Sequence, residues 1–94
     1  MSLARHNPKR DRNERALVAA LGAVPGVIVH RISGPGIPDL LVGHRKRYVL
    51  LEIKSKRGRL EPLQVAFHDT ARALGLPCYV VTTIDEALAA LGIA

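Results

Sequence analysis

The predicted order of elements, α-β-β-β-α-β-α, indicates an α/β domain with a mixed central sheet flanked by helices. Two apolar, β-branched-rich runs on either side of a short basic segment are typical of a β-hairpin. Two stretches with helical spacing of apolar residues each end at a glycine. A strand that follows the second of these helices should return parallel to the hairpin through a right-handed crossover, which makes the sheet mixed.

The first helix is expected to follow a basic, polar arm formed by residues 1–9. Asp11 and Glu14 have the spacing of a capping box, in which the first side chain accepts from the backbone of the second. An apolar stripe then continues to about Leu21, and Gly22 ends it. We therefore predict a helix from Asp11 to about Leu21.

The two later helices have start signals of their own. Pro62 stands at a first helical position, where its missing N–H costs nothing, and Thr83 with Glu86 repeats the capping-box spacing. The faces expected to point inward are Leu63, Phe67, Thr70, Ala71 and Leu74 in the second helix and Ile84, Ala87, Leu88 and Leu91 in the third. Further strands are expected over 27–32 and 78–82, with loops over 33–36 and 55–59.

The hairpin brings two acidic residues together. If residues 44–47 form its loop, Gly43 pairs with Tyr48. The same register places Asp39 opposite Glu52, with the two side chains about 5 Å apart. At an effective dielectric of about 20, two carboxylates at that separation repel by roughly 3 kcal/mol, whereas a cross-strand pair contributes only about 0.2–1 kcal/mol. A proton or a cation must therefore be shared between them, and carboxylate oxygens suit a hard ion such as magnesium.

The residues around Asp39 and Glu52 indicate that the two carboxylates form a functional site. Glu52 stands in an apolar run, where an unpaired carboxylate would cost several kcal/mol without a metal or a partner. Lys54 follows two residues later, on the same strand face. Each residue also has a non-functional interpretation. Asp39 would then be an aspartate at the start of a strand after proline, and Glu52 an exposed strand carboxylate paired to Lys54. Lys54 itself would be a solvated residue like the basic residues that follow it.

Composition limits the class of protein. Ninety-four residues, 48% of them hydrophobic, support one small domain over 1–94 and exclude a disordered chain. Fourteen Lys and Arg against eight Asp and Glu give a net charge of +6, which favours nucleic acid over an acidic membrane surface as the partner. Cys78 is the only cysteine, which excludes a disulfide framework and a thiolate zinc cluster. Because no secretory signal or membrane span is present, we expect a cytoplasmic, DNA-associated protein.

The pattern Pro38-Asp39, followed by Glu52-Ile53-Lys54 at the end of a hairpin, resembles the PD-(D/E)xK nuclease superfamily. It is most similar to the VRR-NUC (virus-type replication-repair nuclease) branch, in which a glycine-rich loop precedes the Asp and a Leu-x-x-x-Gln helix start follows the ExK strand. Those features are residues 33–36 and 60–64 here. The resemblance covers roughly residues 11–91 and implies a restriction-endonuclease-like αβββαβα core.

One position departs from that branch. Glu61 occupies the helix-opening place where Ser or Thr is usual, which leaves the helix cap to be determined.

The resemblance implies roles for these residues. Asp39 and Glu52 would hold a divalent metal with the backbone carbonyl of Ile53, whose side chain points into the core. Lys54 would orient the attacking water and steady charge on the phosphate. Gln64 would sit on the first helical turn beside the metal, with an ordinary surface glutamine as the alternative.

Glu14 has two competing roles. It corresponds to a further metal-site carboxylate in the family, or it serves the capping box with Asp11. His68, one turn after Gln64, would touch DNA or be an ordinary surface histidine. The candidates for phosphate contact, with solvated loops as the alternative, are Arg45, Lys46, Arg47, Lys56, Arg57 and Arg59.

The implied activity is a Mg²⁺- or Mn²⁺-dependent endonuclease that cuts DNA by in-line attack of a metal-activated water. Preference for DNA structure over sequence is implied as well, with stand-alone members acting as homodimers on branched DNA such as four-way (Holliday) junctions in DNA repair. Two cuts across a symmetric junction need two sites, which a two-fold dimer supplies.

Two rival interpretations stay open. The first is a non-catalytic DNA-binding module that keeps the nuclease fold, although an intact Asp39, Glu52 and Lys54 argue against it. The second is an oligomeric structural domain with incidental charges, which a buried, metal-free Asp39 and Glu52 with perturbed pKa would support.

Overall fold

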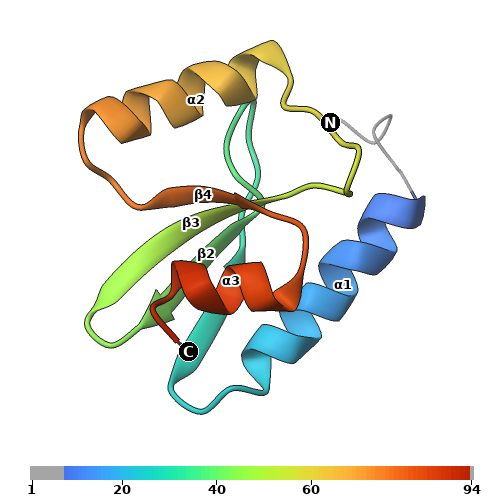
Figure 1. The fold of residues 1–94 in the computed structure, drawn as a ribbon, viewed down its shortest axis with the longest axis vertical. Helices are drawn as coiled ribbons and strands as arrows, with labels where there is room; N and C mark the ends of the chain where they lie inside the picture. The colour runs from blue at the N-terminus through green and yellow to red at the C-terminus, as the bar shows by residue number, and fades with distance from the viewer. Residues whose placement is uncertain (1–7, 94) are drawn as a thin grey trace.

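The computed structural model describes residues 8–93, with side chains described from residue 12 onward. Its sheet has the strand order β1-β2-β3-β4, antiparallel except for the parallel β3–β4 pair, and helices lie on both faces (Figure 1). The predicted α/β class, element order and mixed sheet are therefore confirmed. The elements are α1 (Pro8–Gly22), β1 (Val27–Arg31), β2 (Leu40–His44), β3 (Arg47–Ile53), α2 (Pro62–Ala73), β4 (Cys78–Val81) and α3 (Ile84–Ala90).

The hydrophobic core lies between the sheet and the helices α1 and α3. It is built from alternate strand residues, because every second side chain of a strand points to the same face. Leu21 of α1 and Ala87 of α3 are fully buried against this face. Ala87 and Leu91 are buried and Ile84 and Leu88 are partly buried, as predicted for the third helix.

The predicted start of the first helix is wrong. α1 begins at Pro8, so Asp11 lies inside the helix and the capping box of Asp11 with Glu14 does not form its start. Proline is favoured in a first helical turn, and it takes that place here. Residues 1–7 of the predicted arm lie outside the described residues, and the last two residues of that arm are helical.

The hairpin has the predicted register but a shorter loop. Gly43 pairs with Tyr48, as expected, and His44 pairs with Arg47 instead of standing in the loop. The turn therefore consists of residues 45 and 46, whose φ angles of 50° and 69° are both positive. A two-residue turn of this hand matches the twist of the strands and requires positive φ at both positions. The sequence lacks the Asn-Gly signal that usually marks it.

The face that α2 buries also differs from the prediction. Gln64, His68 and Ala71 are the buried residues of this helix, whereas Leu63 is 61% exposed and Leu74 is 69% exposed. Of the predicted inward stripe, only Ala71 is buried and Phe67 is half-buried. The helix is rotated so that its polar side chains reach a carboxylate on the sheet, and these polar contacts override the apolar spacing.

The cap of the third helix forms as predicted. Thr83 is the N-cap residue of α3, and its Oγ1 accepts a hydrogen bond from the Glu86 N–H at 3.2 Å. The Glu86 carboxylate accepts in return from the Thr83 N–H at 3.2 Å. Within the described residues, no helix is long and apolar enough to cross a membrane.

Candidate active site

Asp39 and Glu52 share the face of the sheet that α2 covers. Asp39 comes directly before β2, and the pairing of Leu40 with Leu51 extends to place it opposite Glu52, as the sequence predicted. The Asp39 Oδ2 atom accepts a hydrogen bond from the Ile53 N–H at 2.7 Å. The side chain thus replaces the missing backbone partner at the end of β2 and is fixed beside β3.

Glu52 is fully buried, and Gln64 contacts it from the first turn of α2. The Gln64 Nε2 donates to the Glu52 Oε2 at 3.2 Å, while the Gln64 Oε1 accepts from the Glu61 N–H at 2.8 Å. Glu61 is the N-cap residue of α2, and its N–H would otherwise lack a helical partner. The two bonds fix both ends of the Gln64 amide, so the glutamine predicted on the first turn is oriented toward the buried carboxylate.

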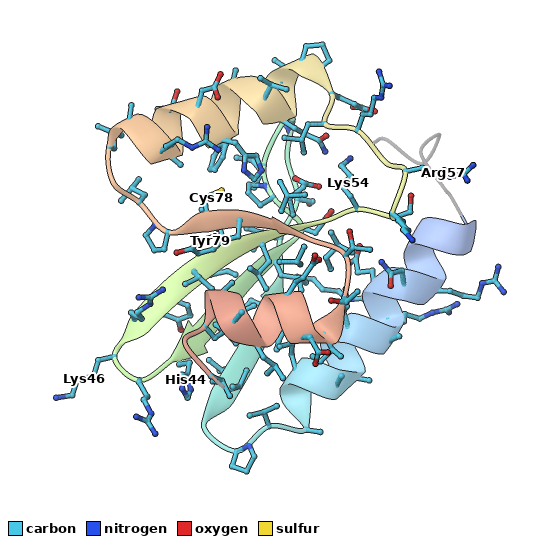
Figure 2. All side chains as sticks on the ribbon, in the orientation of Figure 1. His44, Lys46, Lys54, Arg57, Cys78 and Tyr79 are labelled. Atoms are coloured by element: carbon cyan, nitrogen blue, oxygen red, sulfur yellow. The ribbon has the colours of Figure 1, made fainter. Side chains whose placement is uncertain are left out.

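Lys54 follows directly after β3, at the end of the strand that faces the first turn of α2 (Figure 2). Its backbone N–H donates to the Val81 carbonyl at 3.0 Å, which continues the parallel pairing beyond Ile53. The side chain is half-buried, and its positive charge contributes to lowering the pKa of His68. Because alternate residues of a strand share a face, the Lys54 side chain leaves the sheet on the same side as Glu52.

The buried His68 and the half-buried Cys78 complete this cluster; the sequence interpretation placed His68 on DNA or at the surface and gave Cys78 no role in the site. His68 is 6% exposed, so neither the DNA-contact nor the surface interpretation holds. Burial lowers its pKa most strongly, followed by the charge of Arg72, and burial followed by the Glu52 charge raises the pKa of Cys78. Both groups are therefore neutral near pH 7. The i, i+4 spacing of His68 from Gln64 was the available signal.

Glu14 approaches the site from the other face of the sheet. Its Oε2 lies 3.8 Å from the Arg31 Nε, and its side chain is 17% exposed. Arg31 pairs with Leu40, the residue after Asp39, so Glu14 reaches the same end of the sheet as the two acidic residues. The structure gives Glu14 an ion pair, and a metal role for it stays a prediction.

The basic residues expected to contact phosphate fall into two groups. The connector after Lys54 carries one group beside the site, while the turn between β2 and β3 carries the other at the far end of the hairpin (Figure 2). The seven residues of β3 separate these groups by about 20 Å. All six side chains are exposed: Lys56, Arg57 and Arg59 in the connector, and Arg45, Lys46 and Arg47 at the turn.

The donor set suits magnesium better than a metal that needs many protein ligands. Among residues 8–93, no cluster of three or more His, Cys, Asp and Glu side chains could hold a metal ion. Magnesium is commonly held by one or two carboxylates, with waters and substrate phosphates filling its other positions. Asp39 and Glu52 provide two carboxylates. The Ile53 carbonyl points toward the Asp39 side, because the N–H and C=O of a strand residue share one direction.

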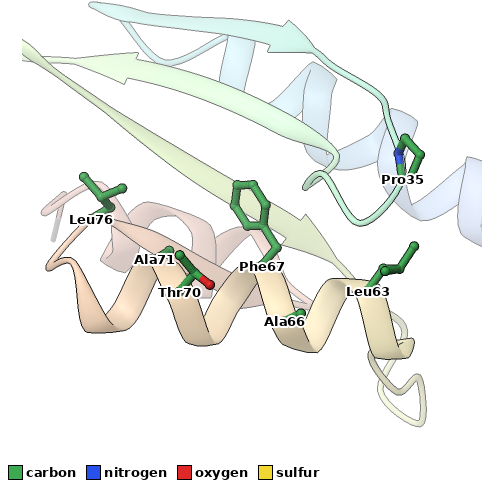
Figure 3. A pocket seen from close by; sticks show the side chains of 7 residues that line it. All are labelled: Pro35, Leu63, Ala66, Phe67, Thr70, Ala71 and Leu76. Atoms are coloured by element: carbon green, nitrogen blue, oxygen red, sulfur yellow. The ribbon is translucent and has the colours of Figure 1, made fainter.

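An apolar groove lies along the flank of α2 that the predicted inward stripe occupies. Figure 3 shows the Phe67 ring rising from the helix between Leu76 at one end and Leu63 and Pro35 at the other. The groove has a volume of about 350 Å³ and contains no charged lining residue. Ile28 and Tyr48, which are 52% and 50% exposed, extend the apolar surface on this side of the sheet.

Comparison with solved structures confirms the resemblance in fold. A VRR_NUC domain superposes with a TM-score of 0.74 at 24% sequence identity, covering 89% of this chain and 95% of that one. Hjc, a Holliday junction resolvase from the archaeal hyperthermophile Archaeoglobus fulgidus, gives a TM-score of 0.59 at 28% identity. That match covers 80% of this chain and 64% of Hjc.

Both neighbours are PD-(D/E)xK-type nucleases, and this chain shares their α/β fold. No protein-family model matches the chain, and no curated protein does.

Proposed function

We propose that this chain is a divalent-metal-dependent endonuclease that hydrolyses phosphodiester bonds in branched DNA, such as four-way junctions. The observation that carries the proposal is the fully buried Glu52 beside an immobilised Asp39, in a fold shared with two nucleases. Burying a carboxylate is costly unless a charge or a set of hydrogen bonds compensates it, so this arrangement is typical of a functional site. Such a substrate would place the protein with intracellular DNA.

The carboxylates of Asp39 and Glu52 would hold Mg²⁺ or Mn²⁺ together with the Ile53 carbonyl. When bound, the ion would supply Lewis acidity at the phosphate and make a water molecule more acidic. Asp39 is kept in place by the Ile53 N–H, and Glu52 by the Gln64 amide. The chain therefore presents oxygen ligands that need little rearrangement on binding.

Lys54 would supply the positive charge that the protein itself brings to the reaction. It follows Glu52 by two residues on the same strand face and is half-buried, so its ammonium group would lie near the acidic pair. There it would donate a hydrogen bond to a phosphate oxygen or to the attacking water. Charge that develops on the phosphate would thereby be stabilised in a partly water-excluded site.

The exposed basic residues would position DNA without reading its sequence. Lys56, Arg57 and Arg59 would grip the backbone beside the scissile phosphate. The turn residues, about 20 Å away, would contact the backbone roughly six base pairs further along. Contacts to the backbone at two places about six base pairs apart would allow the protein to recognise the shape of the DNA.

The proposed working form is a homodimer that associates through the uncharged groove on α2. A chain with net charge +6 repels a second copy, so contact through a face without charged lining residues costs least. Leu63 on α2 and Leu76 after it line the groove and are 61% and 53% exposed, and dimerisation would bury them. Two-fold symmetry would then supply two sites for two cuts.

The proposal is tested by incubating labelled four-way junction with wild-type protein and Mg²⁺ or Mn²⁺, beside Asp39→Asn and Lys54→Met. Each substitution should lower the cleavage rate by about 10²–10³-fold or more, because Asp39 would hold the metal ion and Lys54 would contact the phosphate or the attacking water. Junction affinity measured in Ca²⁺ should change much less.

The matched control is Asp85→Asn, which makes the same change in the first turn of α3 on the opposite face of the sheet. It should cleave at the wild-type rate. Junction binding without cleavage by the wild type would identify a non-catalytic DNA-binding module. Cleavage by Asp39→Asn at the wild-type rate would contradict the assigned site.

A further inference from the structure

The orientation of α2 is unusual for a helix that packs on a sheet. Gln64 and His68 are 8% and 6% exposed, whereas the neighbouring Leu63 and Val65 are 61% and 41% exposed. Turning two polar side chains inward and two apolar ones outward forfeits hydrophobic burial, so the inward residues need a compensating role. Gln64 has one in its bond to Glu52, and His68 requires its own explanation.

His68 contacts the same carboxylate as Gln64, but at the other oxygen atom. Its Nε2 lies 4.0 Å from the Glu52 Oε1, while Gln64 donates to the Glu52 Oε2. The separation from His68 exceeds a direct hydrogen bond, and such contacts commonly tighten only when substrate and cofactor assemble. Two side chains one helical turn apart thus face the two oxygens of one buried carboxylate.

Cys78 packs against the imidazole ring of His68. Its Sγ lies 3.4 Å from the His68 Nδ1 and 4.0 Å from the Nε2, so the thiol lies alongside the ring. Of the two ring nitrogens, Nε2 is the one that faces Glu52, so the tautomer with its proton on Nε2 can donate to the Glu52 Oε1.

We propose that His68 is a positioning residue for Glu52, which it holds together with Gln64 in the single orientation that a divalent cation needs. The inference rests on the proposed function and adds to it a residue behind the metal ligands. Hydrogen-bonding partners behind a ligand orient it, and losing one typically lowers metal affinity by about 10–100-fold. Because His68 is buried, its effect should fall on the cation and leave the DNA surface unchanged.

The test compares His68→Leu with His68→Gln by titrating each protein with Mg²⁺ and Mn²⁺ in a calorimeter. Leu fills the site without a donor, whereas the Gln amide nitrogen takes nearly the place of Nε2. His68→Leu should weaken cation binding by about 10–100-fold, and His68→Gln should restore most of it. The cation concentration that half-saturates junction cleavage should shift in the same order, with junction affinity in Ca²⁺ unchanged.

His44→Leu is the matched control, because it makes the same substitution at the far end of β2 on the opposite face of the sheet. Cation affinity should not change in it. If His68→Leu fails to fold, the same cation titration is made with Cys78→Ala and Cys78→Ser, which leave His68 and Glu52 unaltered. Removing the thiol that packs against the His68 ring should weaken cation binding a few-fold, and the serine side chain, which is close to cysteine in size, should restore most of it.

The outcomes separate this inference from the proposed function. Wild-type protein that neither binds the cation nor cleaves DNA would overturn the proposed function. Cation binding that is lost in Asp39→Asn but unchanged in both His68→Leu and Cys78→Ala would overturn the role of His68 alone. Equal weakening in His68→Leu and His68→Gln would show that the donor does not matter and would also overturn it.

Discussion

The two faces of the sheet are built on opposite principles. The face toward α1 and α3 buries only apolar strand residues, each at most 2% exposed: Leu40, Val42, Val49, Leu51, Ile53 and Val81. The face toward α2 buries a carboxylate, an amide and an imidazole, and leaves Ile28 and Tyr48 about half exposed. The first arrangement stabilises the fold, whereas the second lowers stability on the face proposed for catalysis and association.

The energetics of the two faces differ in sign. Each apolar side chain on the core face contributes about 1.5–3 kcal/mol through burial. A buried carboxylate costs several kcal/mol unless its surroundings compensate the charge, and Gln64 donates one hydrogen bond to Glu52 on this face. The core face therefore specifies the structure, while the α2 face is expected to gain stability from the cation proposed to bind there.

The largest stability difference should come from the same substitution on each face. Leu51→Ala opens a cavity in the core and should lower the free energy of unfolding by about 2–5 kcal/mol. Leu63→Ala, on the exposed flank of α2, should change it by less than about 0.5 kcal/mol. Urea unfolding at a protein concentration low enough to keep the chain monomeric checks both. Equal losses of unfolding free energy in the two variants would contradict the claim that the core face alone stabilises the fold.

The same two substitutions should have the opposite order of effect on self-association, with Leu63→Ala the more damaging. Leu63→Ala removes an apolar contact of the groove and should weaken the dimer, which sedimentation velocity measures as a higher dissociation constant. Leu51→Ala, where it folds, should associate like the wild type. A wild-type chain that stays monomeric at every concentration would contradict the proposed dimerisation through the groove.

A smaller effect should distinguish the two basic groups. Replacing Lys56 and Arg57 with glutamine should weaken junction binding and cleavage together, because these residues lie beside the site. Replacing Arg45 and Lys46 should weaken binding alone. Each phosphate contact that is lost should reduce the slope of log affinity against log salt by about 1. Unchanged slopes in both double variants would show that neither group contacts phosphate.

The hairpin register could be predicted because it depends only on symmetry about the turn. Shortening the loop from four residues to two adds the pair His44 and Arg47 without shifting any other pair. Asp39 therefore faces Glu52 under either turn. The turn itself was missed because Arg45 and Lys46 adopt positive φ without a glycine.

The rotation of α2 could not be predicted from apolar spacing. Leu63 and Phe67 form a regular helical stripe, and hydrophobic periodicity alone points that stripe inward. In the structure Gln64 and His68 face the sheet instead. Leaving the buried Glu52 without polar neighbours would cost more free energy than leaving a leucine exposed. The error thus lies at the proposed site, where local rules are most often broken.

The central claim is that the buried carboxylate on the α2 face becomes favourable when a cation binds. Its most direct test is the free energy of unfolding of wild type and Glu52→Gln, each with and without Mg²⁺. Without the cation, Glu52→Gln should be the more stable by on the order of 1 kcal/mol, because it buries no charge. Mg²⁺ should stabilise the wild type and leave the variant unchanged. An equal response to Mg²⁺, or none in the wild type, would contradict the claim.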